Sequence, residues 1–396
     1  MKKPRRFNWL FVILIGQILV NLIGALGPEL GFDALWYHLT EAKLFWQRGS
    51  IDPIPGNLLY WSGLPRLGEI LYMFLPGSLV HWFFGVLSAY FIYRLSGLAP
   101  ALLWYSTLLV GWLSTSAYID LMVTAWLLGA LYFKKNTRIL LLILAGATKL
   151  QAIIYGLAIT LIPWGLLGYL PFALINWYAT GSAIYPFGQN FGFESEWFFN
   201  GFWFWLSRPL RLFFDPAFRV GPIILVIFLL AKNHPYLRIA VLTFAFWFLM
   251  PGTDFGRFAL FPLALMCLAA VKPTRLILTL IILQALIGIS GRAWANIKYL
   301  EPDRTKFLCQ NLKFDFGDFY DCDNWFKTNI KPTDKVLIYG IHNLYYVDFP
   351  FDHESWKNPN TRYTHILVGD SGPVLDLPLV YENSLTRVKL YLNEPQ

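Results

Sequence analysis

Charged residues are scarce in this chain. Asp, Glu, Lys and Arg together make up 14% of its 396 residues, whereas 56% are hydrophobic and 18% are aromatic. So low a charge content excludes an ordinary soluble domain of this length, in which about 25% of residues are charged. We therefore expect an all-α polytopic protein that passes many times through the cell (plasma) membrane.

Cysteine is also rare, with three residues in the whole chain. Cys267 falls in an apolar run, where we expect a packed thiol. Cys309 and Cys322 both lie in the C-terminal tail, where an oxidising compartment would permit a disulfide. Two free thiols are the alternative for this pair.

Acidic residues are missing from the short clusters of Lys and Arg that precede residue 291. These clusters are Lys2 to Arg6, Arg94, Lys134/Lys135/Arg138, Lys232/Arg238 and Lys272/Arg275. Loops rich in Lys and Arg lie on the cytoplasmic side of membrane proteins. The N-terminus is then cytoplasmic and the C-terminus extracytoplasmic. The net charge of +8 is dispersed over these clusters rather than gathered on one stripe, so we expect no nucleic-acid partner.

Long apolar runs predict about 11 crossings. The first, inside the uncharged stretch from Phe7 to Pro28, is long enough for a spanning helix. A cleaved signal peptide is the alternative, although no convincing cleavage site precedes Phe32. The other expected helices are 78–95, 99–114, 119–133, 163–180, 220–231, 239–250, 258–271 and 276–291, with half-helices at 139–148 and 150–162. Broken helices are tolerated at membrane depth where they face protein or a polar cavity, so we expect a cavity there.

Two domains follow from this reading. Residues 1–291 form the transmembrane domain, with a first external loop at 27–63. Residues 292–396 carry 14 of the 24 acidic residues and short β-like runs such as KVLIYGI and THILVG. They predict a small extracytoplasmic α/β domain.

The first external loop contains GFDALWYHLTEAKLFWQRG, which is typical of an amphipathic helix at the membrane interface. Asp33 is a candidate general base, since a carboxylate beside a cavity can accept a proton. The alternative is that Asp33 only caps the helix that begins at Ala34. The three-residue step from His38 to Glu41 puts both on one side of a helix.

Three further charged residues stand near the expected cavity. Asp120 lies at the outer start of a helix, where an acid is either functional or a cap. Lys149 falls between the two half-helices and is a candidate anion ligand, with a snorkelling lysine as the alternative. Arg257 is a candidate phosphate ligand, or it forms a local ion pair with Asp254.

The aromatic segment WYATGSAIYPFGQNFGFESEW, which includes Tyr185, is also expected outside. It covers a lipid or sugar substrate, or it belongs to the aromatic belt of a membrane protein.

Together these residues make the chain resemble the GT-C superfamily of integral-membrane glycosyltransferases, in its protein O-mannosyltransferase and aminoarabinose-transferase-like branch. The most specific piece is FDALWYHLTEAKLFWQRGSI, in which Asp33 matches the catalytic acid of the family's first external loop. SAYIDLMV, with Asp120, is similar to a second acidic position, which in some members helps to hold a metal. GATKLQ, TGSAIYPF and GRFALFPL are similar to three weaker family segments, and WSGLPRLGEI departs from the family's His-Pro-Pro-like motif.

The resemblance implies a hexosyl- or pentosyltransferase of the cell envelope. It would move a sugar from a polyprenyl-phosphate-linked donor to an extracytoplasmic acceptor, a lipid, glycan or protein, with inversion at the anomeric carbon. Asp33 and Asp120 would be catalytic, and His38, Glu41, Lys149, Tyr185 and Arg257 would bind substrate. No cofactor is certain; a divalent metal ion, if used, would be held by Asp33 and Asp120.

Two other hypotheses belong to different functional classes. A transporter or flippase for a lipid-linked sugar would use the same polar cavity without cleaving its substrate. Alternatively, the tail is a binding module and the membrane part a degenerate anchor. The intact candidate residues Asp33, Asp120 and Lys149 argue against the anchor.

Overall fold

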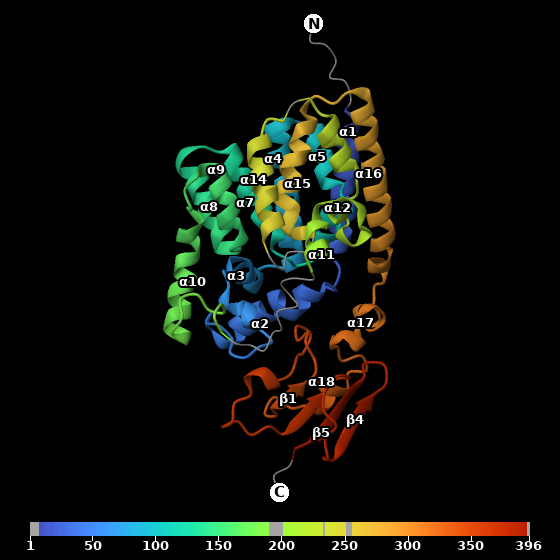
Figure 1. Ribbon diagram of the computed structural model, residues 1–396. Coiled ribbons are helices and arrows are strands. Elements are labelled where there is room, and N and C mark those ends of the chain that lie inside the picture. Colours follow the sequence, from blue (N-terminus) through green and yellow to red (C-terminus); the bar gives the residue numbers. More distant parts are fainter. Residues whose placement is uncertain (1–7, 190–200, 233, 251–255, 394–396) are drawn as a thin grey trace.

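The structure is a computed structural model that describes residues 8–189, 201–232, 234–250 and 256–393 (Figure 1). A bundle of helices occupies one end, and a small sheet occupies the other. The helices α2 (Leu39–Arg48) and α3 (Leu67–Phe74) lie between these two parts. The predicted combination of a helical domain with a small C-terminal sheet is confirmed.

The helices of the bundle follow the predicted apolar runs closely. They are α1 (Trp9–Ala25), α4 (Gly77–Ser96), α5 (Leu98–Tyr105), α6 (Leu108–Leu113), α7 (Asp120–Tyr132), α8 (Lys135–Thr148), α9 (Gln151–Thr160), α10 (Gly165–Thr180), α11 (Phe202–Leu206), α12 (Arg208–Phe214), α13 (Ile223–Leu230), α14 (Leu237–Leu249), α15 (Leu260–Cys267) and α16 (Arg275–Asn296). Within the described ranges, the one helix long and apolar enough by itself to cross a membrane is Arg275–Leu300. The number of crossings is therefore not settled by helix length.

Two interruptions shape the bundle. The predicted break between half-helices is present, because Lys149 adopts an extended conformation (φ −157°, ψ 135°) between α8 and α9. The predicted single helix over 99–114 was wrong, since α5 and α6 are separated at Ser106 and Thr107. The Thr107 side chain caps α6 by accepting a hydrogen bond from the Val110 N–H, which makes a new helix start there favourable.

Glycine allows α10 to lie directly against α8. A side chain at Gly168 would collide with the backbone oxygen of Ile143. The two helices therefore approach at backbone distance, as is common in helix pairs that have lipid rather than water around them.

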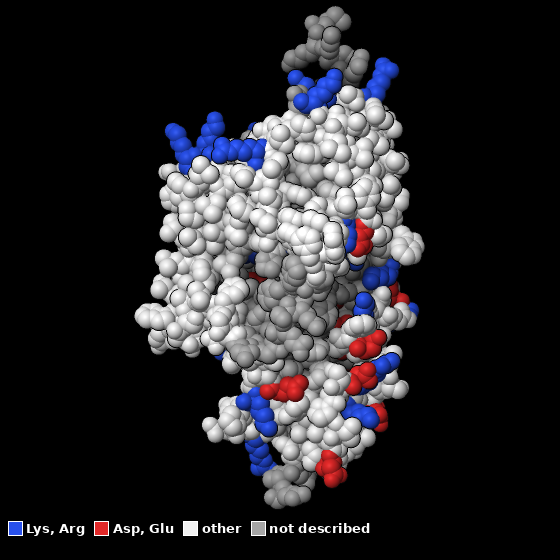
Figure 2. All heavy atoms as spheres, viewed as in Figure 1, with Lys and Arg blue, Asp and Glu red and all other residues white. Residues whose placement is uncertain are grey.

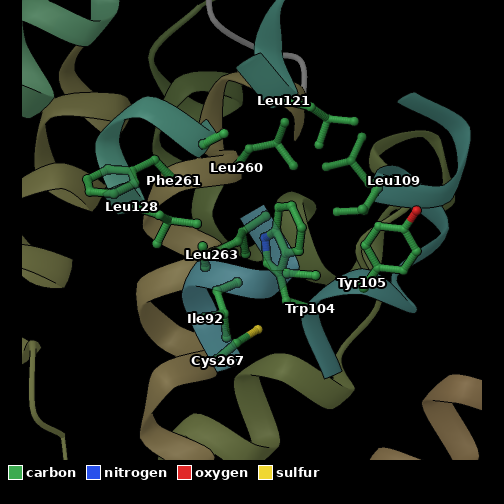
Figure 3. Packing of buried hydrophobic residues seen from close by; sticks show 14 of the residues in the cluster. Ile92, Trp104, Tyr105, Leu109, Leu121, Leu128, Leu260, Phe261, Leu263 and Cys267 are labelled. Carbon is green, nitrogen blue, oxygen red and sulfur yellow. The ribbon is translucent and has the colours of Figure 1, made fainter. Parts of the chain in front are cut away.

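The core of the bundle is built from α4, α5, α7 and α15. Figure 3 shows Trp104 enclosed by aliphatic side chains such as Ile92, Leu128 and Leu263. Cys267 lies in the same cluster as a buried free thiol, as predicted. Many outward-facing side chains of α1, α10 and α16 are exposed and apolar, as expected where lipid is the solvent.

The C-terminal part contains α17 (Arg304–Asn311), α18 (Trp325–Asn329) and a five-stranded mixed sheet with the order β2-β1-β3-β5-β4. The strands are β1 (Val336–Tyr339), β2 (Phe351–His353), β3 (His365–Val368), β4 (Leu379–Asn383) and β5 (Val388–Leu392). β1 pairs in parallel with β2 and β3, whereas β5 is antiparallel to β3 and β4. The runs KVLIYGI and THILVG supply β1 and β3. The preceding helix α16 continues to Asn296, beyond the boundary expected at residue 291.

The first external loop and the C-terminal part share one hydrophobic core. Phe45, Ile54 and Leu59 pack with side chains of β1 and β5. Lys43 of α2 donates hydrogen bonds to the carbonyls of Tyr345, at 2.9 Å, and of Val347. These contacts fix the orientation of the loop that carries Asp33.

Charge is distributed unevenly over the surface. Figure 2 shows Lys and Arg, without Asp or Glu, on the end of the bundle away from the sheet, and both signs of charge near the sheet. The middle of this face is almost free of charge. The basic clusters seen on this face therefore gather at the end of the molecule away from the sheet.

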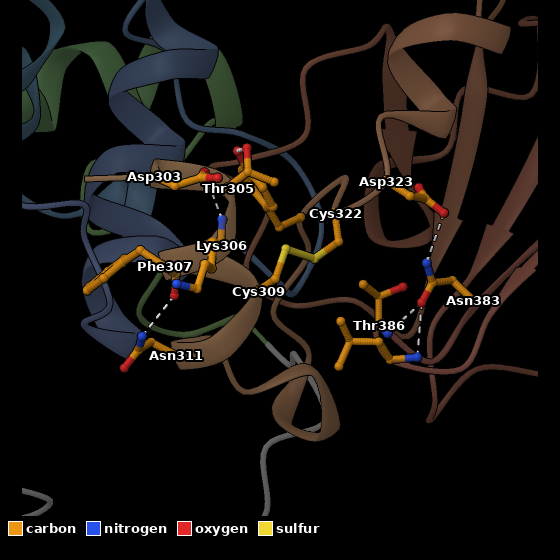
Figure 4. The surroundings of a disulfide bond; sticks show 12 residues. Asp303, Thr305, Lys306, Phe307, Cys309, Asn311, Cys322, Asp323, Asn383 and Thr386 are labelled. Carbon is orange, nitrogen blue, oxygen red and sulfur yellow. Dashed lines mark hydrogen bonds between the residues drawn. A yellow bond between two sulfur atoms is a disulfide. The ribbon is translucent and has the colours of Figure 1, made fainter. Parts of the chain in front are cut away.

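Cys309 of α17 and Cys322 are joined by a disulfide (Figure 4). We expect the double variant Cys309→Ser/Cys322→Ser to lose about 3 kcal/mol of stability in the C-terminal part, because the bridge closes a short loop in the unfolded chain. Thermal unfolding with and without reductant measures this. A melting temperature that neither the variant nor the reductant lowers would contradict a stabilising bridge.

Candidate active site

A cavity of about 530 Å³ opens between the first external loop and the bundle. Its walls come from η1 (Ala34–His38), α2 and α3 on one side. On the other side they come from the α8/α9 break, η4 (Pro216–Phe218) and η5 (Gly256–Ala259). The predicted polar cavity therefore lies at the break around Lys149.

The first loop enters this cavity as a π-helical turn. The Leu39 N–H bonds to the Ala34 carbonyl, five residues back. The Thr40 hydroxyl donates to the Leu35 carbonyl at 2.6 Å and so supplies a partner within the widened turn. Turns of this kind are frequent at functional sites because they redirect side chains. Here Asp33, Tyr37 and His38 all line the cavity.

Asp33 is held by two donors. Its Oδ2 lies 2.6 Å from Arg257 Nη2 and accepts a hydrogen bond from the Tyr37 hydroxyl at 3.0 Å. The Asp33 side chain makes no capping hydrogen bond, so the capping interpretation was wrong. Arg257 joins Asp33 across the cavity, and Asp254, its predicted alternative partner, lies outside the described residues.

A second ion pair lies at the helix break. Lys149 Nζ is 2.6 Å from Asp120 Oδ1, and it stands 4.3 Å from the centre of the Phe258 ring. Asp120 is in the first turn of α7 but does not cap it, since the cap residue is Ile119. Asp120 Oδ2 is buried and has no hydrogen-bond partner among the described residues. The lysine therefore points into the protein rather than snorkelling towards solvent.

A third group of ionisable side chains comes from η1, α2 and α3. His38 Nδ1 is 2.5 Å from Glu69 Oε1, and both side chains are buried. Glu41, one helical turn beyond His38, is also buried and lines the same cavity. Burial, together with the nearby Glu69 carboxylate, raises the pKa of Glu41 well above its usual range.

The structure thus brings five of the seven predicted site residues to the cavity wall, namely Asp33, His38, Glu41, Lys149 and Arg257. Asp120 lies behind Lys149. Tyr185 is buried against Gly63 and is not among the residues that line the cavity, so its role in substrate binding stays a prediction. Part of the aromatic segment after it, residues 190–200, lies outside the described residues.

The sequence reasoning missed several groups of this site. Tyr37 was visible in the loop motif, and its four-residue spacing from Asp33 was the signal that could have found the hydrogen bond between them. Glu69 was not singled out, and no pattern around it indicated that it would pair with His38. Arg219 lies in a short turn between apolar runs, where no sequence pattern indicated a site residue. Its guanidinium lies 4.1 Å from the centre of the Trp112 ring.

Metal binding was left open for Asp33 and Asp120. In the part of the chain that is described, no three or more His, Cys, Asp or Glu side chains come together as a metal site. Each of these two aspartates instead faces a cation of the protein itself.

No protein-family model and no curated protein sequence matches this chain. Its fold is similar to two crystal structures of ArnT from Cupriavidus metallidurans. With the structure bound to undecaprenyl phosphate, the identity is 12% and the TM-score 0.62, over 98% of this chain and 99% of that one. With the apo structure, the identity is 11% and the TM-score 0.59, over the same shares. The chain therefore shares the fold of these two ArnT structures, which is the fold that the resemblance in its sequence predicted.

Proposed function

We propose that this protein is an integral-membrane glycosyltransferase. It transfers a sugar from a polyprenyl-phosphate-linked donor to an acceptor on the extracytoplasmic side, with inversion at the anomeric carbon. The observation that carries this proposal is the pairing of Asp33 with Arg257 beside Lys149 in one enclosed cavity. The ArnT structure that shares the fold is described as bound to undecaprenyl phosphate, which supports a lipid phosphate as the partner.

The cations of the cavity suit the phosphate of such a donor. Lys149, Arg219 and Arg257 all line it, and Lys149 uses one of its three donors on Asp120. In a site with little water, these charges stabilise the negative charge that grows on the departing phosphate. The phosphate leaves with the electron pair of the broken C1–O bond, so the leaving group needs no protonation.

Asp33 is the proposed general base. Its Oδ2 is occupied by Arg257 and Tyr37, whereas Oδ1 makes no other side-chain contact in the described part of the chain. The acceptor hydroxyl would lose its proton to this carboxylate as its oxygen bonds to C1. Attack from the face opposite the phosphate gives inversion.

We expect Asp33→Asn to abolish transfer, by at least about 100-fold, because an amide cannot accept the proton. The measurement is release of radiolabelled sugar from polyprenyl-phosphate donors by purified protein, with and without EDTA to test for a metal. Asp376→Asn, an exposed position in the C-terminal part, is the matched control. Undiminished release by correctly folded Asp33→Asn would refute the assignment of the base. Donors that bind to wild type but are never cleaved would favour the transporter.

We expect Lys149→Met to weaken binding of polyprenyl phosphate roughly 30-fold, equivalent to about 2 kcal/mol for a lost charged hydrogen bond. Lys149→Arg keeps the charge and should retain part of the affinity. Ligand-induced thermal stabilisation reports binding without requiring turnover. Equal affinity in Lys149→Met and wild type would remove Lys149 from the phosphate site.

The charge pattern predicts an extracytoplasmic C-terminus and a cytoplasmic N-terminus. A cysteine introduced at exposed Val374 should react with a membrane-impermeant thiol reagent in intact cells. A cysteine introduced at exposed Lys135 should react only after permeabilisation. The reverse labelling pattern would overturn this orientation and place the cavity on the cytoplasmic side.

A further inference from the structure

The cavity has two chemically different walls. The basic wall carries Lys149, Arg219 and Arg257. The opposite group, here called the acidic wall, consists of His38, Glu41 and Glu69 from η1, α2 and α3. The ionisable groups that act most strongly on Arg257 are Asp33, Tyr37 and Asp120, whereas those that act on Glu41 are Glu69 and Arg66. The strongest charged neighbours of Glu41 thus come from α3 and from the residue that precedes it, not from the basic wall.

The acidic wall contains unsatisfied hydrogen-bond acceptors. Glu41 is 1% exposed and Glu69 is 3% exposed, yet Glu41 Oε1 and Glu69 Oε2 have no hydrogen-bond partner among the described residues. Leaving such an oxygen without a donor is unfavourable in a buried site. A ligand group that brings hydrogen-bond donors to this wall would remove that cost.

Arg66, the cation that interacts with Glu41 and Glu69, is not placed to bind an anion in the cavity. Arg66 is buried, and each of its three nitrogens already donates, to the carbonyls of Leu64 and Ile51 and to the side chain of Asn176. Arg66 is not among the residues that line the cavity. The positive charge of Arg66 offsets the charge of Glu69, and burial together with Glu69 raises the pKa of Glu41, which disfavours the charged form of that side chain. The wall is therefore close to neutral and rich in acceptors.

We propose that His38, Glu41 and Glu69 form the acceptor subsite, and that it takes an uncharged hydroxyl-bearing group rather than a phosphate or an amine. This inference rests on the proposed glycosyltransferase activity. A phosphate would face carboxyl oxygens without a free cation, which is a costly arrangement in a buried site. An ammonium ion would find one ionised carboxylate that is already paired with His38.

His38 then positions the acceptor. Nδ1 of His38 is engaged with Glu69, so Nε2 is the ring nitrogen left for a hydroxyl of the acceptor, which can donate or accept a hydrogen bond. The π turn places this ring five residues from Asp33 in the same cavity wall. In the transfer step the acceptor oxygen bonds to C1, its proton passes to Asp33, and the C1–O bond to phosphate breaks.

The test separates donor chemistry from acceptor recognition. Protein in nanodiscs is given a radiolabelled donor, and two rates are measured: hydrolysis of the donor by water and transfer to a probe. The probes are alkyl glycosides with free hydroxyls, the same glycosides with a phosphate at one hydroxyl, and the same glycosides with an amine. We expect wild type to prefer the uncharged set at least tenfold.

Glu69→Gln and Glu41→Gln are the informative variants, and Glu382→Gln on the exposed face of β4 is the control. In both variants KM for the uncharged probe should rise about tenfold, a larger factor than that by which donor hydrolysis falls. Glu69→Gln introduces an amide N–H donor. It should therefore also reduce the preference for the uncharged probes over the phosphorylated probes. A merely structural role would lower hydrolysis and transfer together.

The outcomes are distinct. The acceptor subsite would be overturned if wild type preferred the phosphate or amine probes. It would also be overturned if the uncharged probes neither reacted nor competed with water. Either result would leave the donor chemistry intact. Absence of any donor cleavage in folded wild type would instead remove the proposed glycosyltransferase, and the acceptor subsite with it.

Discussion

The contact on which the site depends is the ion pair between Asp33 and Arg257. These residues are far apart in the sequence and belong to different walls of the cavity, yet their side-chain atoms lie 2.6 Å apart. Neither charge would be tolerated alone at this depth, because the cost of desolvation is offset only by a close partner. The pair therefore fixes where the first external loop meets the start of α15, and the cavity is the space left around it.

The loop is held just as firmly from its other side. Leu35, two residues after Asp33, packs with Phe307 and Phe314 of the C-terminal part, and Tyr346 donates a hydrogen bond to the Glu29 carbonyl at 2.9 Å. Burial raises the pKa of the Glu29 carboxyl, which accepts hydrogen bonds from Ser78 and from backbone N–H groups. The C-terminal part is thus more than an appended module, since its core continues into the loop that carries the proposed base.

Sequence reasoning went furthest where one physical constraint dominates. Apolar runs bounded by Lys and Arg placed the helices within a few residues, and Lys149 marked the helix break correctly because an isolated charge at membrane depth needs a cavity. It went less far where the outcome depends on contacts between distant segments. Asp33 was not foreseen as the partner of Arg257, because no local pattern states which side chain lies across from another. The division of 99–114 into two helices depends on a Thr107 cap that an apolar run conceals.

The π turn illustrates how small a change in backbone sets the chemistry. In a regular α-helix, Tyr37 would lie over Asp33, and His38 would be rotated away from it by about 140°. The wider turn brings both towards the cavity, at the cost of a displaced backbone hydrogen bond that the Thr40 hydroxyl offsets within the turn. Asp33 can then remain paired with Arg257 while His38, five residues later, pairs with Glu69. One short segment thereby separates the groups suited to a phosphate from those suited to a hydroxyl, and a bond between the two substrates would have to form beside Asp33.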